Sequence, residues 1–180
     1  MPRKRRIQYP GARYHIIGRG NEKRTIYADH WDYKRFLSRV GHLNESYGIK
    51  LHAYCLMPNH YHLLLEITKE NLSIYMKKLL GWYATYFNKR HDRVGGLFQG
   101  RFKSYLIDND TYFLEVSRYI HLNPCKSNLI DRPEDYEWSS MSSYIAKDHG
   151  QVETKKTLSY FKSIENYYDF VFEGSGLHPI

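Results

Sequence analysis

Cysteine is scarce in this chain. The 180 residues include two cysteines, Cys55 and Cys125, which form no CxxC pair. Two distant thiols do not build the dense framework of a small secreted domain, and they lack the spacing of a zinc-ligand pair. The sequence therefore indicates neither a disulfide scaffold nor a cysteine zinc site. It predicts a protein that resides in the reducing cytoplasm.

Long apolar runs are also missing. No stretch approaches the roughly 20 consecutive apolar residues that a membrane span requires, so we expect no membrane partner. Residues 3–6 are basic, but the polar and turn-forming residues 8–11 follow them in place of the apolar segment of a secretion signal. We expect this basic run to be a flexible arm.

Acidic residues are outnumbered by basic ones. The chain has 27 Lys and Arg against 19 Asp and Glu, a formal net charge of +8. This balance suits a polyanionic partner, although charge alone does not identify one. The 18 tyrosines can stack on unpaired bases as well as fill a core. Single-stranded nucleic acid is therefore a candidate partner.

The first half of the chain predicts a strand, a helix and a hairpin. Residues 12–19 are typical of a strand. Asp29 is a good N-cap for the following helix, and Gly48 closes it. The apolar runs 50–57 and 60–67 are joined by only two residues, so a tight antiparallel hairpin is the simplest connection. We expect this hairpin at the centre of the sheet.

The second half adds helices and one strand. Apolar residues recur at three- and four-residue intervals over 72–90, which predicts an amphipathic helix. Residues 101–107 predict a fourth strand. The polar residues 108–110 offer N-caps for a third helix, which Pro124 is expected to stop. A last amphipathic helix is predicted over 155–172.

The order of these elements predicts the fold class. Strand, helix, strand, strand, helix, strand is the order of a split βαβ, or ferredoxin-like, α+β sandwich with an antiparallel sheet of four to five strands. The helix that Pro124 ends follows this sandwich. We expect one catalytic domain over residues 1–130 and a C-terminal extension over 131–180.

A His-Tyr-His motif begins the second strand of the predicted hairpin. Because residues i and i+2 of a strand point to the same face, His60 and His62 project side by side while Tyr61 turns to the other face. Two imidazoles so placed can chelate one divalent ion. The alternative for a bare His-x-His motif is two unrelated histidines on a partly exposed strand.

Tyr119 lies beside the apolar stripe of the third predicted helix. The core-facing stripe contains Val116 and Ile120, and Tyr119 lies about 100° away from it. Such a tyrosine packs at the edge of the core with a solvated hydroxyl, or it uses that hydroxyl as a nucleophile. Asn123 follows one turn later on the same side, where its amide oxygen is either a third metal ligand or a helix cap. Glu115 lies on the same stripe. Its carboxylate either orients Tyr119, binds the metal, or is simply solvated.

Two segments resemble the signatures of a known family. Met57-Pro58-Asn59-His60-Tyr61-His62-Leu63-Leu64 and Ser117-Arg118-Tyr119-Ile120-His121-Leu122-Asn123-Pro124 look like the two motifs of single-tyrosine HUH transposases. The resemblance is strongest to the REP-associated tyrosine transposases of bacteria, to which Tyr136-Glu137-Trp138-Ser139-Ser140 is also similar. It covers about residues 8–145.

The resemblance implies a chemistry for these residues. His60, His62 and Asn123 hold a divalent metal, and Tyr119 attacks DNA to form a 5′-phosphotyrosine bond. Imidazoles favour transition metals, whereas Mg²⁺ prefers oxygens, so we expect Mn²⁺ or Mg²⁺, with Mn²⁺ the better fit. The resemblance also implies palindromic hairpin DNA as substrate and a nucleoid-associated enzyme in a bacterial cytoplasm.

Several basic residues are candidate DNA-phosphate contacts. They are Arg3, Lys4, Arg5, Arg6, Arg13, Arg19, Lys77, Lys78, Lys89, Arg90, Arg101 and Lys103. Two other functions remain open: a non-catalytic binder of hairpin nucleic acid, and a phosphodiesterase that uses water while Tyr119 is only structural. A homodimer, in which the tyrosine helix serves the histidines of the partner, is also left open.

Overall fold

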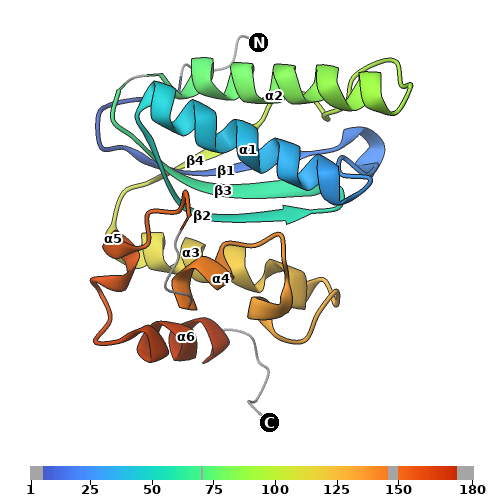
Figure 1. Cartoon of the computed structure of the whole chain (residues 1–180). Helices are drawn as coiled ribbons and strands as arrows, with labels where there is room; N and C mark the ends of the chain where they lie inside the picture. The colour runs from blue at the N-terminus through green and yellow to red at the C-terminus, as the bar shows by residue number, and fades with distance from the viewer. Residues whose placement is uncertain (1–5, 70, 146–149, 174–180) are drawn as a thin grey trace.

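The chain folds as an α+β protein in layers. The computed structural model describes residues 6–69, 71–145 and 150–173. Helices α1 (His30–Tyr47) and α2 (Leu72–Arg90) cover one face of a sheet, and α3 (Asp110–Lys126) covers the other. Figure 1 shows the last helix, α6, beneath α3, on its far side from the sheet. Within the described residues, no helix is long and apolar enough to cross a membrane.

The sheet has the predicted ferredoxin-like topology. Its strands are β1 (Arg13–Arg19), β2 (Ile49–Met57), β3 (His60–Ile67) and β4 (Lys103–Ile107), in the order β2-β3-β1-β4 with every neighbouring pair antiparallel. This is the strand order of the split βαβ sandwich. The predicted fold class is confirmed.

One expectation about the sheet is wrong. The hairpin β2–β3 does not lie at its centre, because β1 is inserted between β3 and β4 and leaves β2 at an edge. The outer side of β2 is covered instead by the C-terminal segment, through the hydrogen bonds Leu56 N to Trp138 O, 2.9 Å, and Glu153 N to Leu51 O, 2.8 Å. Because of this cover, the apolar residues of β2 are buried although β2 is an edge strand.

The expected ends of α1 are confirmed. The Asp29 carboxylate accepts hydrogen bonds from the backbone N–H groups of Trp31 and Asp32 at the first turn. Gly48 ends the helix in the left-handed conformation, with φ +61°, which costs glycine little. These two caps fix where the chain turns towards β2.

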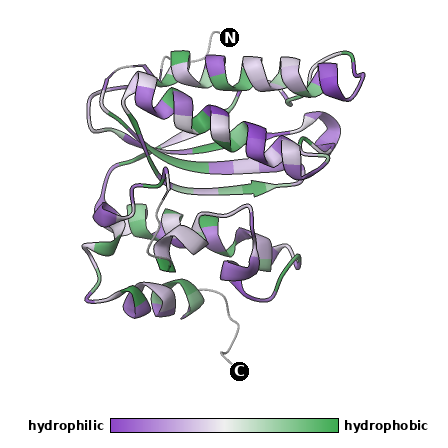
Figure 2. Ribbon diagram, viewed as in Figure 1, coloured by the Kyte–Doolittle hydropathy of each residue, from purple (hydrophilic) through white to green (hydrophobic). Residues whose placement is uncertain are grey.

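Alternation along the strands separates two apolar clusters. Tyr61 and Leu63 of β3 face α1 and α2 in the larger cluster, whereas Leu64 packs in a smaller one with Phe113 and Ile120 of α3. Figure 2 shows hydrophobic stretches along the strands between these layers. His60 and His62 point to the same side of β3 as Leu64, because the three residues are spaced two apart. They therefore lie on the α3 face of the sheet.

Helix α3 runs through the proline that was expected to stop it. It ends at Lys126, with Pro124 inside its last turn. Proline lacks an N–H and its ring crowds the carbonyl four residues earlier, a cost that the packing of α3 against the sheet outweighs here. Asn123 therefore keeps helical geometry, and its side chain stays on the side of α3 that bears Tyr119.

The C-terminal segment also differs from its prediction. Residues 155–172 form two short helices, α5 (Lys155–Leu158) and α6 (Ile164–Glu173), because the chain bends at Ser159–Ser163. The remaining short elements are η1 (Asn21–Lys23), η2 (Pro133–Asp135) and α4 (Met141–Ile145). Helix α6 packs against α3. The domain boundary at residue 130 stays a prediction.

Candidate active site and metal centre

The histidine pair and Asn123 converge across two elements. The ring centroids of His60 and His62 lie 5.1 Å apart on β3. Asn123 of α3 lies 3.2 Å from Nε2 of His60 through its Oδ1, and 3.4 Å from Nε2 of His62 through its Nδ2. Two imidazole nitrogens and one amide are thus turned towards a common point.

The tautomer of His60 follows from its neighbour. The Nδ2 of Asn59 donates to the Lys23 carbonyl at 3.1 Å, so the Oδ1 of Asn59 faces the Nδ1 of His60 at 2.7 Å and accepts its proton. His60 then presents a lone pair at Nε2, opposite the oxygen of Asn123. Two facing lone pairs favour a cation between them, so this donor set fits a metal ion.

His62 is oriented by a third histidine, His15 of β1. The Nε2 of His15 lies 2.9 Å from the Nδ1 of His62, and the two rings are stacked with centroids 5.1 Å apart. If Nδ1 of His62 donates to His15, Nε2 of His62 keeps its lone pair for a ligand. A metal-binding histidine usually donates its second ring nitrogen in this way.

Burial keeps all three histidines neutral. It lowers the pKa of His15 to about 4 and that of His62 to about 2, where the neighbouring His15 and His60 add to the effect. Burial also lowers the pKa of His60, and Arg19 acts in the same direction, whereas the Oδ1 of Asn123, which can accept a hydrogen bond from a protonated Nε2, opposes them. The neutral imidazole is the form that binds metals.

Tyr119 stands beside this cluster with its hydroxyl accessible. Its side chain is 41% exposed, and its ring centroid lies 5.5 Å from that of His62 and 5.9 Å from that of His15. The Nζ of Lys126 lies 5.5 Å from the ring centroid. Among the described residues, no hydrogen bond occupies the Tyr119 hydroxyl. The ring of Tyr119 thus contacts His15, His62 and Lys126, while its hydroxyl oxygen is left open to a ligand.

A cavity of about 770 Å³ joins these groups. His60, His62 and Tyr119 line it together with Tyr105 of β4, and no acidic side chain of the described chain does so. Its cationic lining consists of three of the predicted DNA contacts, Arg19, Arg101 and Lys103. The cavity therefore suits an anionic, partly aromatic ligand.

Other predicted DNA contacts lie outside the cavity. Arg13 forms an ion pair with Asp110 at 2.7 Å. Arg90 forms ion pairs with Asp29, 2.7 Å, and with the buried Asp32, 2.6 Å, which tie α2 to the start of α1. Neither guanidinium lines the cavity. The predicted contacts Arg3, Lys4 and Arg5 lie outside the described residues.

Glu115 is engaged elsewhere. Its carboxylate forms an ion pair with Arg118, whose guanidinium lies 4.5 Å from the Phe170 ring centroid on α6. Glu115 does not line the cavity. Of the predicted stripe on α3, the structure therefore brings Tyr119 and Asn123 to the histidines and leaves Glu115 with Arg118.

The sequence did not single out His15 or Tyr105. In the sheet, His15 pairs with Leu64 and Tyr105, which places it on the α3 face diagonal to His62. The one local signal was a histidine at an alternating position of a predicted strand. Its relation to His62 depends on the register of β1 against β3, which the sequence pattern did not reveal.

The fold and the site together define a class of protein. A ferredoxin-like sheet carries two histidines on a central strand, with a tyrosine and an asparagine one helical turn apart facing them. Residues 8–123 match the family model described as "Transposase IS200 like". The chain belongs to that family.

Individual relatives agree with this assignment. A protein from Haemophilus influenzae named as a REP-associated tyrosine transposase is 31% identical over 107 residues, which are 53% of this chain and 61% of the relative. The matched part thus spans less than two thirds of that relative. Among solved structures, a REP-associated tyrosine transposase bound to a REP hairpin matches with TM-score 0.68 and 16% identity, over 86% of this chain and 96% of that one.

A second structural likeness shows that the fold alone does not decide the chemistry. A tRNA(His) guanylyltransferase from Saccharomyces cerevisiae matches with TM-score 0.50 and 11% identity, over 98% of this chain and 82% of that one. Function must therefore be argued from the site.

Proposed function

We propose that this protein is a DNA transposase of the single-tyrosine type, which cuts and rejoins single-stranded, hairpin-containing DNA. The observation that supports this most is the position of Tyr119. Its side chain shares one cation-lined cavity with His60 and His62, whose Nε2 atoms face the amide of Asn123. A nucleophile, a candidate metal site and anion-binding side chains thus meet at one place.

Tyr119 carries the covalent step. Its oxygen attacks the phosphorus of a phosphodiester, the P–O3′ bond breaks, and the products are a 5′-phosphotyrosine and a 3′-hydroxyl. The leaving oxygen takes up a proton, and the proton of the tyrosine hydroxyl passes to water, because Glu115 is paired with Arg118. The new ester keeps the bond energy needed for rejoining.

His60, His62 and Asn123 would hold Mn²⁺ or Mg²⁺. Such an ion supplies charge neutralisation and polarisation of the scissile phosphate. Asn59 and His15 fix the two imidazoles, and Arg19, Arg101 and Lys103 line the path of the DNA backbone. No cluster of three or more metal-ligating His, Cys, Asp or Glu side chains is found in the described part of the chain. The proposed site depends on two histidines and an amide.

The decisive experiment detects the covalent intermediate. Hairpin oligonucleotides labelled at the 3′ end, which stays on the fragment attached to Tyr119, are incubated with the protein and Mn²⁺ and run on a denaturing protein gel. We expect a labelled, slower band with wild type and none with Tyr119→Phe, which should still bind the DNA. His60→Ala should lose the metal-dependent cleavage, whereas His42→Ala, which changes an exposed histidine of α1, should behave as wild type.

The same gel separates the alternatives. Cleavage without a labelled protein band would show a phosphodiesterase that uses water. Binding without cleavage would show a non-catalytic binder of hairpin nucleic acid. An adduct that persists in Tyr119→Phe would overturn the assignment of the nucleophile.

Whether the site works within one chain or across a homodimer is a separate proposal. In the structure, Tyr119 already faces His62 of its own chain, which favours a site completed within one chain. Mixing Tyr119→Phe with His60→Ala chains tests this, since restored adduct formation would require the exchange of helices between two chains.

A further inference from the structure

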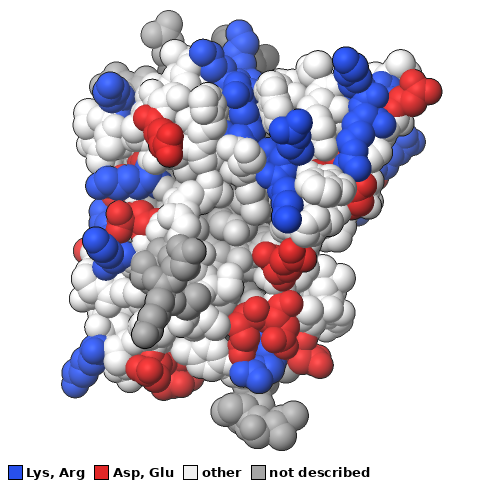
Figure 3. All heavy atoms as spheres, viewed as in Figure 1, with Lys and Arg blue, Asp and Glu red and all other residues white. Residues whose placement is uncertain are grey.

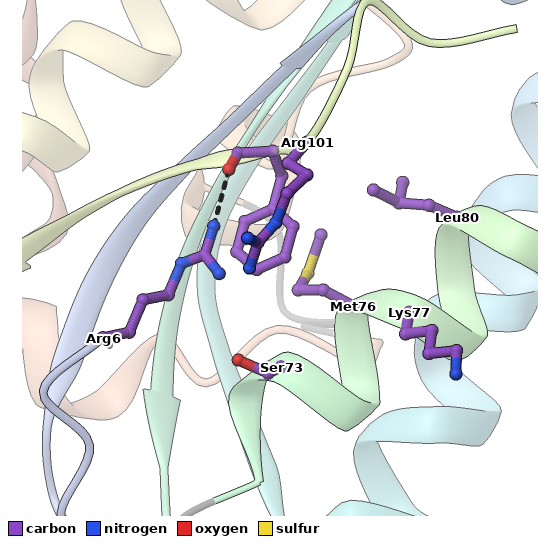
Figure 4. A pocket seen from close by; sticks show the side chains of 7 residues that line it. Arg6, Ser73, Met76, Lys77, Leu80 and Arg101 are labelled. Carbon is purple, nitrogen blue, oxygen red and sulfur yellow. Dashed lines mark hydrogen bonds between the residues drawn. The ribbon is translucent and has the colours of Figure 1, made fainter. Parts of the chain in front are cut away.

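A second pocket lies near the catalytic cavity, with which it shares Arg101. Its volume is about 370 Å³, within the lower part of the range of small-molecule sites. Figure 4 shows Met76 and Leu80 of α2 reaching into it, with Arg6 and Arg101 on the opposite side. Its defining residues are the cations Arg6, Lys77 and Arg101 and the apolar side chains Met76, Leu80 and Phe102.

The pocket combines an apolar floor with a cationic rim. Met76 is fully buried and Phe102 is 9% exposed, so the floor is part of the core. No acidic side chain lines the pocket within the described chain. On the face seen in Figure 3, many Lys and Arg lie in the upper part, over α1 and α2, with some acidic groups among them, and further acidic groups lie lower. The lining of the pocket itself, with three cations and no acidic side chain among the described residues, favours an anion.

Arg6 shapes one wall of this pocket. Its Nη2 donates to the Phe102 carbonyl at 2.9 Å, marked in Figure 4, and its Nε donates to Ser104 Oγ at 2.8 Å. Its guanidinium also lies 4.0 Å from the Phe102 ring centroid. These contacts hold the aromatic ring and the cation together at the entrance to β4.

The pocket and the catalytic cavity meet at one residue. Arg101 lines both. Beyond it, Phe102 lines the pocket on the α2 face of the sheet, whereas Lys103 lines the cavity on the α3 face, as alternation along an extended chain requires. Because β4 is an edge strand, a DNA strand can pass around this edge from one site to the other.

We propose that this pocket binds one unpaired nucleotide of the DNA strand that enters the catalytic cavity. The base lies against Leu80 and Phe102, over the buried Met76, and the adjoining phosphate lies between Lys77 and Arg101. Phosphate alone would need no apolar floor, and an apolar ligand would need no cations, whereas a nucleotide uses both. This inference rests on the proposed function, because it places a second contact on the same substrate.

An abasic scan tests the pocket. Hairpin oligonucleotides carry single-stranded tails in which one nucleotide at a time lacks its base, and affinity is measured by fluorescence anisotropy in EDTA. For wild type we expect about tenfold weaker binding at one tail position and smaller effects elsewhere. In Leu80→Trp, which fills the pocket, intact DNA should bind more weakly and the position-specific loss should disappear.

Two neighbouring lysines provide a matched control. Lys77 lines the pocket, while the Nζ of Lys78 lies 5.3 Å from the Tyr47 ring centroid and Lys78 does not line the pocket. Both are exposed. Lys77→Glu should weaken binding about tenfold and Lys78→Glu clearly less, although both change the net charge equally. If Leu80→Trp does not fold, the comparison of Lys77→Glu with Lys78→Glu still tests whether the pocket binds a nucleotide.

The outcomes separate the two proposals. Equal abasic effects along the tails, a position-specific loss unchanged in Leu80→Trp, or equal effects of the two lysine changes would overturn the pocket assignment. If wild type still forms the Tyr119 adduct in that case, the proposed function stands. Failure of wild type to bind any hairpin would overturn both.

Discussion

His15 shows how a single residue can act through another. It is 6% exposed, and among the described residues its side chain forms a hydrogen bond only with Nδ1 of His62. Burial lowers its pKa to about 4, so at neutral pH it is uncharged and its Nε2 can accept that bond. His15 is therefore a positioning residue, which fixes the ring orientation and the tautomer of His62.

His15→Ala should weaken Mn²⁺ binding by about 10- to 100-fold, the usual effect of losing such a partner. Titration calorimetry with Mn²⁺ measures this directly. His15→Gln, whose amide oxygen can accept the same hydrogen bond, should restore much of the affinity, which a purely structural role would not require. Unchanged Mn²⁺ affinity in His15→Ala would contradict the positioning role.

At the scale of elements, helix α3 is held between the sheet and α6. The hydroxyl of Tyr167 on α6 lies 2.9 Å from Ser117 Oγ and 2.8 Å from Nδ1 of His121, and both partners lie on α3. The Nε2 of His121 continues the network to Ser140 Oγ at 2.7 Å. All four groups are buried, so the C-terminal segment supports the helix that carries Tyr119.

Tyr167→Phe should lower the free energy of unfolding by about 1–3 kcal/mol, because it leaves buried polar groups without a partner. Urea denaturation followed by circular dichroism gives this value. Tyr112→Phe makes the same change at a 40% exposed residue of α3 and should have little effect. Equal stability of wild type and Tyr167→Phe would show that the network does not hold α6 to α3.

The whole molecule should lose stability in mild acid. Several buried histidines remain neutral in the folded protein; for His121, burial lowers the pKa to about 3, against about 6.5 in an unfolded chain. Between these values the unfolded chain binds a proton that the folded protein does not. Stability is therefore fully present above about pH 6.5 and is lost as the pH falls towards 3.

His121→Gln isolates one contribution to this effect. Between pH 7 and pH 5, wild type should lose about 2 kcal/mol more unfolding free energy than this variant, as a folded pKa near 3 implies. Urea titrations at the two pH values, in EDTA to keep metal away from the other histidines, provide the comparison. If the unfolding free energy of both proteins depended on pH in the same way, the acid sensitivity would come from groups other than His121.

Much of the fold could be predicted because it is encoded locally. The caps Asp29 and Gly48 and the two-residue turn between β2 and β3 depend on neighbouring residues. The same holds for His60 and His62, whose common face follows from strand geometry. The end of α3 was predicted incorrectly, since packing against the rest of the molecule overrides the local breaker Pro124. The break between α5 and α6 was missed, because the apolar spacing over 155–172 gave no sign of the bend at residues 159–163.

The sequence by itself determined which side chains are available for chemistry, namely the histidine pair, Tyr119 and Asn123, and on which elements they lie. The predicted ferredoxin-like order already places β1 between β3 and β4, but only the tertiary structure decided the register and side-chain packing by which His15 meets His62 and Arg101 joins two cavities. The reason is physical. Periodicity records which face of an element is buried, whereas the pairing of distant strands depends on the closure and packing of the whole chain.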